Sequence, residues 1–290
     1  MRGRAAARRL CEIGRWTSLA ALAAAFGFPL YWLVTMAFKP PVDWNPPGRV
    51  VWFPQNFTLD NFRTLLGLTD ESTFLQATFP IAVKPIITSV IASVGGTVLA
   101  LSIGILCAYG IARFRAGGRK LPFIVLLVRV FPPIVLVIPL FFMWVQLGLW
   151  DTYQGLILIY AAITFPLVVW LVRSFLLDVP REIAEAAIVD GCTYWGAFFK
   201  AVLPQVKGGL AATALFVFIV NWSDLMIAEV LTLERAETAT VYLAGLRADE
   251  ATLFGPQAAL GLILMIPPLA LGLAIRRYLV RGLTLGALRP

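Results

Sequence analysis

Long apolar stretches separated by short polar segments make up most of this chain. A helix needs about 20 apolar residues to cross the roughly 30 Å hydrocarbon core of a bilayer, and six stretches are long enough. None shows the alternation over about ten residues that is typical of membrane barrel strands. We therefore predict an all-α, polytopic membrane protein in which residues 1–290 form a single domain. The predicted spans are residues 16–38, 82–111, 121–147, 154–176, 208–232 and 256–276, with a long loop at 39–81.

A polar interruption at residues 178–204 carries the signals of two short helices joined by a turn. Pro180 suits the first helical position, because its missing N–H would have no partner there. Gly191 is placed to end the first helix and Thr193 to cap the second, which Pro204 is placed to end. The helix pair has a small, apolar face, and we expect it to serve as a docking surface.

The charged residues support this topology. They make up only 14% of the chain, against about 25% in soluble domains. Most of the 24 Lys and Arg residues lie in the two termini, the loop at 112–120 and the interruption at 178–204. Because cytoplasmic segments of membrane proteins are enriched in basic residues, we predict that these four regions, including both termini, are cytoplasmic. The loop at 39–81 is then an outer loop, in which residues 57–67 suggest a short amphipathic helix.

The composition also limits the chemistry of the chain. It has no histidine, which is the commonest general base and metal ligand. Its three cysteines are far apart and lack the spacing of a metal site or a disulfide framework. We predict no catalytic residues, no metal site and no enzymatic activity in this chain.

Two features of the spans bear on packing and on a transport path. Small residues are frequent in the span at 82–111, and they allow helices to approach closely in lipid. Arg129 is costly in lipid, so it should face protein or water, and Asp224 or Glu229 could pair with it. The candidate path residues are Arg129, Asn221, Trp222, Ser223 and Asp224. For the segment at 221–224, structural packing is as good an interpretation as path lining.

The interruption also resembles a known motif. Glu185-Ala186-Ala187, followed by Gly191 and later by Leu203-Pro204, resembles the EAA loop of inner-membrane permease subunits of ABC importers. Further motifs extend the resemblance over nearly the whole chain and point to the maltose-type carbohydrate branch (MalG-like). These motifs are Leu59–Phe62, Ala108–Arg115, Phe131–Pro133, Leu147–Thr152, Trp222–Leu225 and Arg281–Ala287. Ala201 stands where the family usually has isoleucine.

The resemblance implies a type I ABC importer permease with six membrane helices. In this family the loop lies in a cleft of a cytoplasmic ATPase subunit, and it carries the motion of the ATPase to the membrane spans. Since the chain has no Gly-x-x-x-x-Gly-Lys-Ser/Thr run, ATP and Mg²⁺ should bind to a separate ATPase subunit and no cofactor to this chain. The implied ATPase-coupling residues are Glu185, Ala186, Ala187, Asp190, Gly191, Leu203 and Pro204. For Asp190, docking and capping are equally good interpretations.

The implied partners are a paralogous second permease, two copies of the ATPase, an extracytoplasmic sugar-binding protein and membrane lipid, but no nucleic acid. The implied location is the inner membrane of a prokaryote, and the implied cargo is a di- or oligosaccharide. The alternatives are an ABC importer for another solute, such as glycerol phosphate or a polyamine, and a secondary transporter or channel without an ATPase. A secondary transporter would predict an internal repeat and carboxylates at the midplane, neither of which is evident. A membrane enzyme has little support without histidine.

Overall fold

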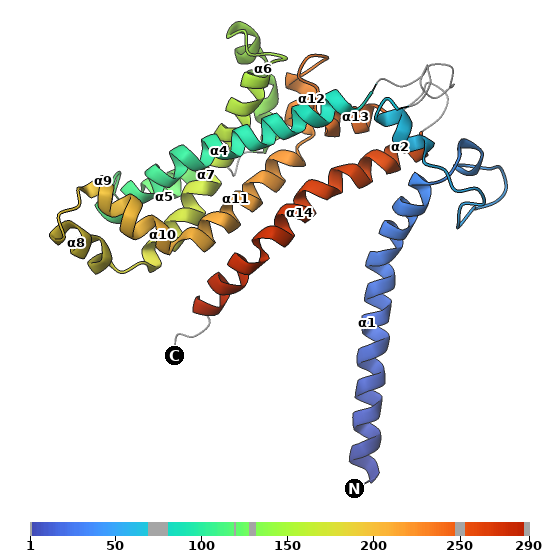
Figure 1. Ribbon diagram of the computed structural model, residues 1–290, viewed down its shortest axis with the longest axis horizontal. Helices are drawn as coiled ribbons and strands as arrows, with labels where there is room; N and C mark the ends of the chain where they lie inside the picture. Colours follow the sequence, from blue (N-terminus) through green and yellow to red (C-terminus); the bar gives the residue numbers. More distant parts are fainter. Residues whose placement is uncertain (1, 69–80, 119, 128–131, 247–252, 287–290) are drawn as a thin grey trace. The chain divides into compact units, whose positions relative to one another are not determined.

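The computed structural model describes residues 2–68, 81–118, 120–127, 132–246 and 253–286, and these residues form helices and no strand (Figure 1). They divide into two compact units. The first comprises Met1–Ala82 and Gly245–Ile263, and the second comprises Val83–Ala244 and Leu264–Pro290. The prediction of a single domain stays a prediction.

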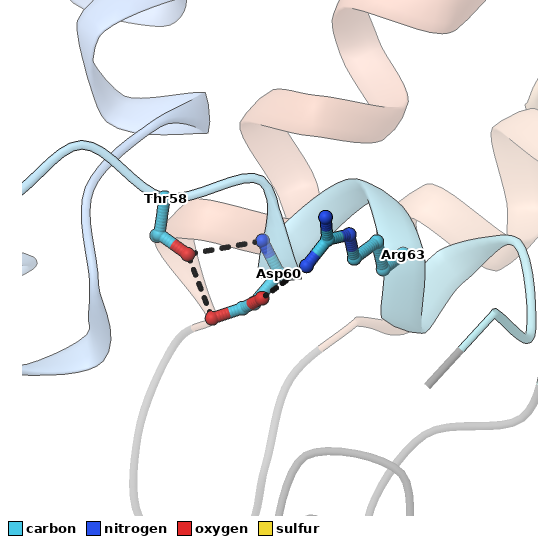
Figure 2. Close-up of polar contacts among 3 residues, drawn as sticks. All are labelled: Thr58, Asp60 and Arg63. Atoms are coloured by element: carbon cyan, nitrogen blue, oxygen red, sulfur yellow. Dashed lines mark hydrogen bonds and ion pairs between the residues drawn. The ribbon is translucent and has the colours of Figure 1, made fainter. Parts of the chain in front are cut away.

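The first unit is built on the long helix α1, Arg2–Ala37, and the loop that follows it. This loop contains a short 3₁₀ turn, η1 (Pro41–Asp43), and the helix α2 (Asp60–Leu65), which lies within the short helix predicted at 57–67. At the start of α2 the Thr58 hydroxyl donates to Asp60 Oδ2 at 2.7 Å and accepts from the Asp60 N–H at 3.1 Å. Arg63 lies 3.7 Å from the same carboxylate (Figure 2).

The second unit is built on three apolar helices that pack together, α4 (Val83–Phe114), α7 (Tyr153–Asp178) and α11 (Lys207–Trp222). The predicted close approach of the span at 82–111 is confirmed. A Cβ atom added to Gly96 would lie 2.7 Å from Tyr160 Cβ, and one added to Gly104 would lie 2.5 Å from Val168 Cγ1. Neither distance leaves room for a methyl group, so the glycines set the separation of α4 and α7. The other helices are α5 (Leu121–Leu127), α6 (Pro133–Gln146), α8 (Arg181–Val189), α9 (Tyr194–Ala197), α10 (Leu203–Gln205), α12 (Met226–Leu231), α13 (Ala239–Gly245) and α14 (Phe254–Gly286), with a π-helix, η3, at Phe198–Val202.

Four helices among the described residues are long and apolar enough to cross a membrane: Gly14–Ala37 of α1, all of α4 and α7, and Phe254–Arg276 of α14. A bent pair, Tyr194–Gln205 and Lys207–Trp222, could form a fifth span. The predicted span at 208–232 is therefore too long at its C-terminal end, because α11 ends at Trp222. The span predicted at 121–147 comprises the short helices α5 and α6, with residues 128–131 outside the described ones. The all-α membrane fold is confirmed, and the count of six spans stays a prediction.

Asp151, in the turn between α6 and α7, joins this turn to the segment that follows α12. Its carboxylate accepts the N–H groups of four consecutive residues, from Leu233 to Ala236, at distances from 2.9 to 3.4 Å. Its own N–H donates to the carbonyl of Leu231 at 2.9 Å. Burial acts to raise the pKa of Asp151, but the four N–H donors favour the charged form and lower it on balance.

We expect Asp151→Asn to destabilise the second unit by about 1–3 kcal/mol, because an amide cannot accept all four donors. A carboxyl group with a lowered pKa contributes stability above its unfolded pKa of about 3.9, and loses it as the pH falls through the lower folded value. The stability difference between wild type and variant should therefore be full at neutral pH and shrink in acid. Thermal unfolding of the detergent-solubilised protein over a pH series measures it.

The control variant is Asp60→Asn, which removes an equal charge. Asp60 and Arg63 are both exposed, and such ion pairs contribute about 0–1 kcal/mol. A loss of stability in Asp60→Asn as large as that in Asp151→Asn would contradict the role given to the four N–H donors.

Candidate docking surface

Residues 178–204 form the predicted helix-turn-helix at one end of α4, α7 and α11 (Figure 1). The first helix is α8, and the second runs from α9 through the π-helix η3 into α10. A bend of 77° then separates α10 from α11. We call residues 178–204 the docking segment. The docking segment is thus continuous with α11, a helix of the membrane bundle.

The turn between the two helices is fixed by backbone geometry. Gly191 has a φ of 91°, which lies in the left-handed region that side chains with a Cβ disfavour. Its N–H donates to the carbonyl of Ile188 at 3.0 Å, and the N–H of Cys192 donates to the carbonyl of Ala187 at 3.0 Å. These two hydrogen bonds form a Schellman motif that ends α8. The Thr193 hydroxyl then accepts the N–H of Gly196 at 3.1 Å and caps α9, as predicted.

Both proline predictions need correction. Pro180 is the residue before α8, so the first helical residue is Arg181. Pro204 does not end the second helix, which continues to Gln205 and breaks at Val206. The π-helix η3 immediately before α10 has altered the hydrogen-bond register, and Pro204 occupies the first turn of α10, where its missing N–H costs little.

Buried side chains anchor the docking segment to the membrane helices. Phe198 is completely buried and its ring lies 4.3 Å from that of Tyr109 in α4. Val202 packs into the same apolar cluster, with Val172 and Leu176 of α7. Each anchor removes apolar area from water or lipid headgroups, so a movement of the docking segment must displace α4 and α7.

Arg113, near the end of α4, adds a polar anchor. Its Nη2 donates to the carbonyl of Val179 at 2.9 Å and to that of Pro180 at 3.4 Å. These carbonyls lie just before α8, so the guanidinium fixes the point at which the chain enters the docking segment. Sequence reasoning identified Arg113 as part of a family motif and of the basic loop at 112–120, but nothing in the sequence places it beside residues 66 positions later.

The opposite side of the docking segment is exposed and rich in aromatic side chains. Trp195 and Phe199 stack with ring centroids 6.1 Å apart and are both exposed, as are Val189 and Tyr194. The spacing of Trp195 and Phe199 by four residues places them on one helix face, and this spacing could have been read from the sequence. A large apolar surface rimmed by charged side chains is typical of a site for protein binding.

The predicted coupling residues lie mainly on exposed parts of this segment. Glu185, Ala186, Asp190, Gly191 and Pro204 are exposed, whereas Ala187 and Leu203 are half-buried. Asp190 is the C-terminal cap residue of α8, and its N–H donates to the carbonyl of Ala186. In the described part of the chain, no hydrogen bond or ion pair holds the Glu185 side chain, which is thus free to contact another protein.

The candidate path residues at 221–224 are mostly engaged within the chain. The Asn221 side chain is buried and donates from Nδ2 to Thr97 Oγ1 at 3.2 Å, which joins α11 to α4. Trp222 is also buried, and its Nε1 donates to the carbonyl of Leu264 at 3.0 Å. Ser223 is exposed. These contacts favour the packing interpretation for Asn221 and Trp222.

Asp224 accepts hydrogen bonds from the Tyr160 hydroxyl at 3.2 Å and from the Ala228 N–H at 3.0 Å. Its carboxylate therefore ties α7 to the start of α12. Glu229, the other partner predicted for Arg129, is exposed. Arg129 lies outside the described residues, so the predicted salt bridge stays a prediction.

The family of binding-protein-dependent transport system inner membrane components matches residues 100–285, which include the whole docking segment. The chain belongs to this family. It is thus a multi-pass inner-membrane permease subunit of an ABC transporter, which confirms the resemblance found in the sequence.

Two relatives and one solved structure are similar to this permease over most of its length. It is 33% identical over 281 residues to the trehalose transport system permease protein SugB of Mycobacterium tuberculosis, covering 94% of this chain and 97% of the relative. It is 34% identical over 265 residues to the trehalose/maltose transport system permease protein MalG of Thermococcus litoralis, covering 90% and 91%. A bacterial ABC transporter involved in the import of the acidic polysaccharide alginate shares the fold, with a TM-score of 0.75, 21% identity, and coverage of 93% of this chain and 96% of that one. The predicted ABC importer permease fold is confirmed.

In this permease we expect Gly191→Ala to destabilise the docking segment by about 1–2 kcal/mol, because a Cβ is strained at a φ of 91°. No heavy atom lies within 4 Å of the position that the Cβ would take, so the loss would come from the backbone alone. Gly191→Asn is the control, since asparagine tolerates the left-handed region better. Proteolysis of the docking segment in membrane vesicles should be faster in the alanine variant than in the asparagine variant. Equal rates would contradict the backbone argument.

Proposed function

We propose that this permease translocates a di- or oligosaccharide and receives its driving force through the docking segment. Relatives over nine-tenths or more of the chain are permeases for trehalose or for trehalose and maltose, which supports a sugar as the cargo. The single observation that supports the energy route is the architecture of the docking segment. Phe198 and Arg113 hold one side of the segment against α4 and α7. The other side exposes Glu185, whose side chain has no hydrogen bond or ion pair within the described chain, and the stacked rings of Trp195 and Phe199.

The proposed partner on this surface is a cytoplasmic ATPase, two copies of which bind ATP and Mg²⁺. The sequence contains no phosphate-binding loop. ATP hydrolysis is therefore assigned to the separate ATPase, and this chain couples that hydrolysis to transport. Closure of the ATPase copies would move α8 and α9 as a rigid pair, because the Schellman turn and the Thr193 cap leave the turn little freedom. The buried contact of Phe198 with Tyr109 would then pass the displacement to α4.

The remaining parts of the proposed assembly are a paralogous second permease and an extracytoplasmic sugar-binding protein. Both termini of this chain are proposed to lie in the cytoplasm, on the side of the docking segment, as the distribution of basic residues supports. A hetero-dimer of permeases would give the sugar a path between two chains. Such a path agrees with the engagement of Asn221 and Trp222 inside this one.

The test is ATP hydrolysis by the complex reconstituted in lipid vesicles with its binding protein. A panel of mono-, di- and oligosaccharides is compared with glycerol phosphate and polyamines. We expect stimulation of ATP hydrolysis and vesicle uptake by di- or oligosaccharides. Stimulation by a non-carbohydrate alone would reject the sugar, and uptake that is independent of ATP would reject the coupling role.

A further inference from the structure

The loop that follows α1 turns back along the helix that it has just left. The ring centroid of Trp52 lies 6.2 Å from that of Phe28 and 6.0 Å from that of Trp32. Both residues precede Ala37, the last residue of α1, and Phe28 does so by nine positions. At a rise of 1.5 Å per residue, the loop therefore reaches roughly 13 Å back from the end of the helix.

This return sets the loop beside the part of α1 that is long and apolar enough to cross a membrane. The part of α1 that can cross a bilayer is Gly14–Ala37, and Phe28 and Trp32 belong to its C-terminal half. When Gly14–Ala37 crosses a bilayer, a loop beside these residues would lie below the level at which the helix leaves the hydrocarbon. An irregular backbone is tolerated there only where its polar groups find partners within the protein.

Two consecutive carbonyl groups of the loop have such partners. Lys39 Nζ donates to the carbonyl of Val51, and the Tyr31 hydroxyl donates to the carbonyl of Trp52 at 2.8 Å. Each bond satisfies a carbonyl group that would otherwise have no hydrogen-bond partner in hydrocarbon, which is strongly unfavourable. Both donors come from α1 or the two residues after it, so the loop is held by the same helix that sets its depth.

Lys39 itself is withdrawn from solvent. Its side chain is completely buried, and its ammonium lies 4.2 Å from the ring centroid of Trp32. Burial lowers the pKa of Lys39, and the nearby Asp43 offsets part of this effect. The Asp43 carboxylate also accepts the Gln55 N–H at 3.4 Å and so closes the base of the loop.

The side chains that this scaffold turns outward are apolar. Val50, Trp52 and Phe53 are exposed, with 57% of Trp52 and 66% of Phe53 accessible. Exposed Arg49 precedes them, and its charge complements a lipid phosphate. Exposed apolar side chains next to a basic residue, beside a membrane helix, are typical of segments that lie in the interface of a bilayer.

We propose that residues 49–54 form a wedge that inserts into the lipid leaflet around the C-terminal half of α1. Val50, Trp52 and Phe53 contact acyl chains, and Arg49 contacts the phosphate level. The wedge rests on α1 being a membrane helix and not on the cargo or the ATPase. A lipid-anchored wedge would fix the depth and rotation of the first span relative to the outer loop.

The test places a nitroxide label at Phe53→Cys in the complete transporter in vesicles, with native Cys11, Cys107 and Cys192 replaced by serine. Collision rates with oxygen, which concentrates in lipid, are compared with those of a water-soluble nickel complex. The control is Val42→Cys, in the 3₁₀ turn just beyond α1, where 74% of the side chain is exposed. We expect oxygen collisions to dominate at position 53 and nickel collisions to dominate at position 42.

Dominant nickel collisions at position 53 would overturn the wedge, because they would place the loop in water. Low collision rates with both reagents would also overturn it, because they would show that another protein subunit covers the loop. A second measurement does not need the cysteine replacements. Quenching of tryptophan fluorescence by lipids brominated on the acyl chain should fall when Trp52→Phe replaces wild type, and unchanged quenching would contradict the proposal.

Lys39→Met tests whether the hydrogen bond from Lys39 to the Val51 carbonyl holds the wedge in place. It keeps an unbranched side chain, one atom shorter, but leaves the Val51 carbonyl without its donor. In the Phe53→Cys background we expect the collision rates to shift toward the nickel complex, as the loop moves to water to solvate that carbonyl. No shift would show that Lys39 does not hold the loop in lipid.

Discussion

Replacing Glu185 with lysine is expected to abolish sugar uptake driven by ATP while leaving the permease folded and inserted. Glu185 is exposed on α8, and no hydrogen bond or ion pair in the described part of the chain involves its side chain. Folding should therefore tolerate the change within about 0.5 kcal/mol. A charge reversal in a desolvated contact typically costs about 2–5 kcal/mol of binding, which corresponds to at least a roughly 30-fold weaker complex with the ATPase.

The measurements are ATP hydrolysis and sugar uptake by the same vesicles, with membrane insertion checked by protease protection. Glu12→Lys is the matched control, because it makes the same charge change at an exposed residue of α1, outside the docking segment. We expect the control to transport as wild type does. Failure of Glu185→Lys to insert would show that the residue supports folding and not coupling.

Phe198→Ala and Phe199→Ala are expected to differ sharply although they are neighbours in sequence. Phe198 is 0% exposed in the cluster with Tyr109 and Val202, whereas Phe199 is 53% exposed. Truncation of a buried phenylalanine costs about 3–5 kcal/mol through lost burial and the cavity that remains. Truncation of the exposed one should change stability by about 0.5 kcal/mol or less.

Thermal unfolding of the purified permease compares the stability of the two variants, and the unfolding temperature should fall only in Phe198→Ala. Co-purification or interferometry compares the affinity of the two variants for the ATPase. Phe199→Ala should weaken docking without loss of stability, since its ring stacks with Trp195 on the exposed face. Equal unfolding temperatures for the two variants would mean that the docking segment is not anchored through Phe198.

Much of the docking segment could be predicted because its signals are local. The positive φ of Gly191 and the cap formed by Thr193 depend on residues within one turn, and such turn chemistry is encoded by residue type. The ends of the segment were predicted less well. Pro180 lies one position before the first residue of α8. Pro204 does not end the second helix, because a π-helix and the bend into α11 shift the register in a way that no short-range signal indicates.

The sequence by itself determined the class of the protein. Apolar stretches of membrane length, the bias of basic residues and the spaced motif around Gly191 need no tertiary contacts, since hydrophobic length and charge act on each segment alone. Only the tertiary structure decided which aromatic side of the docking segment is buried, which distant carbonyls Arg113 and Asp151 hold, and that the loop at 49–54 returns along α1. These features join residues far apart in the chain, and burial of a side chain depends on what the fold brings against it.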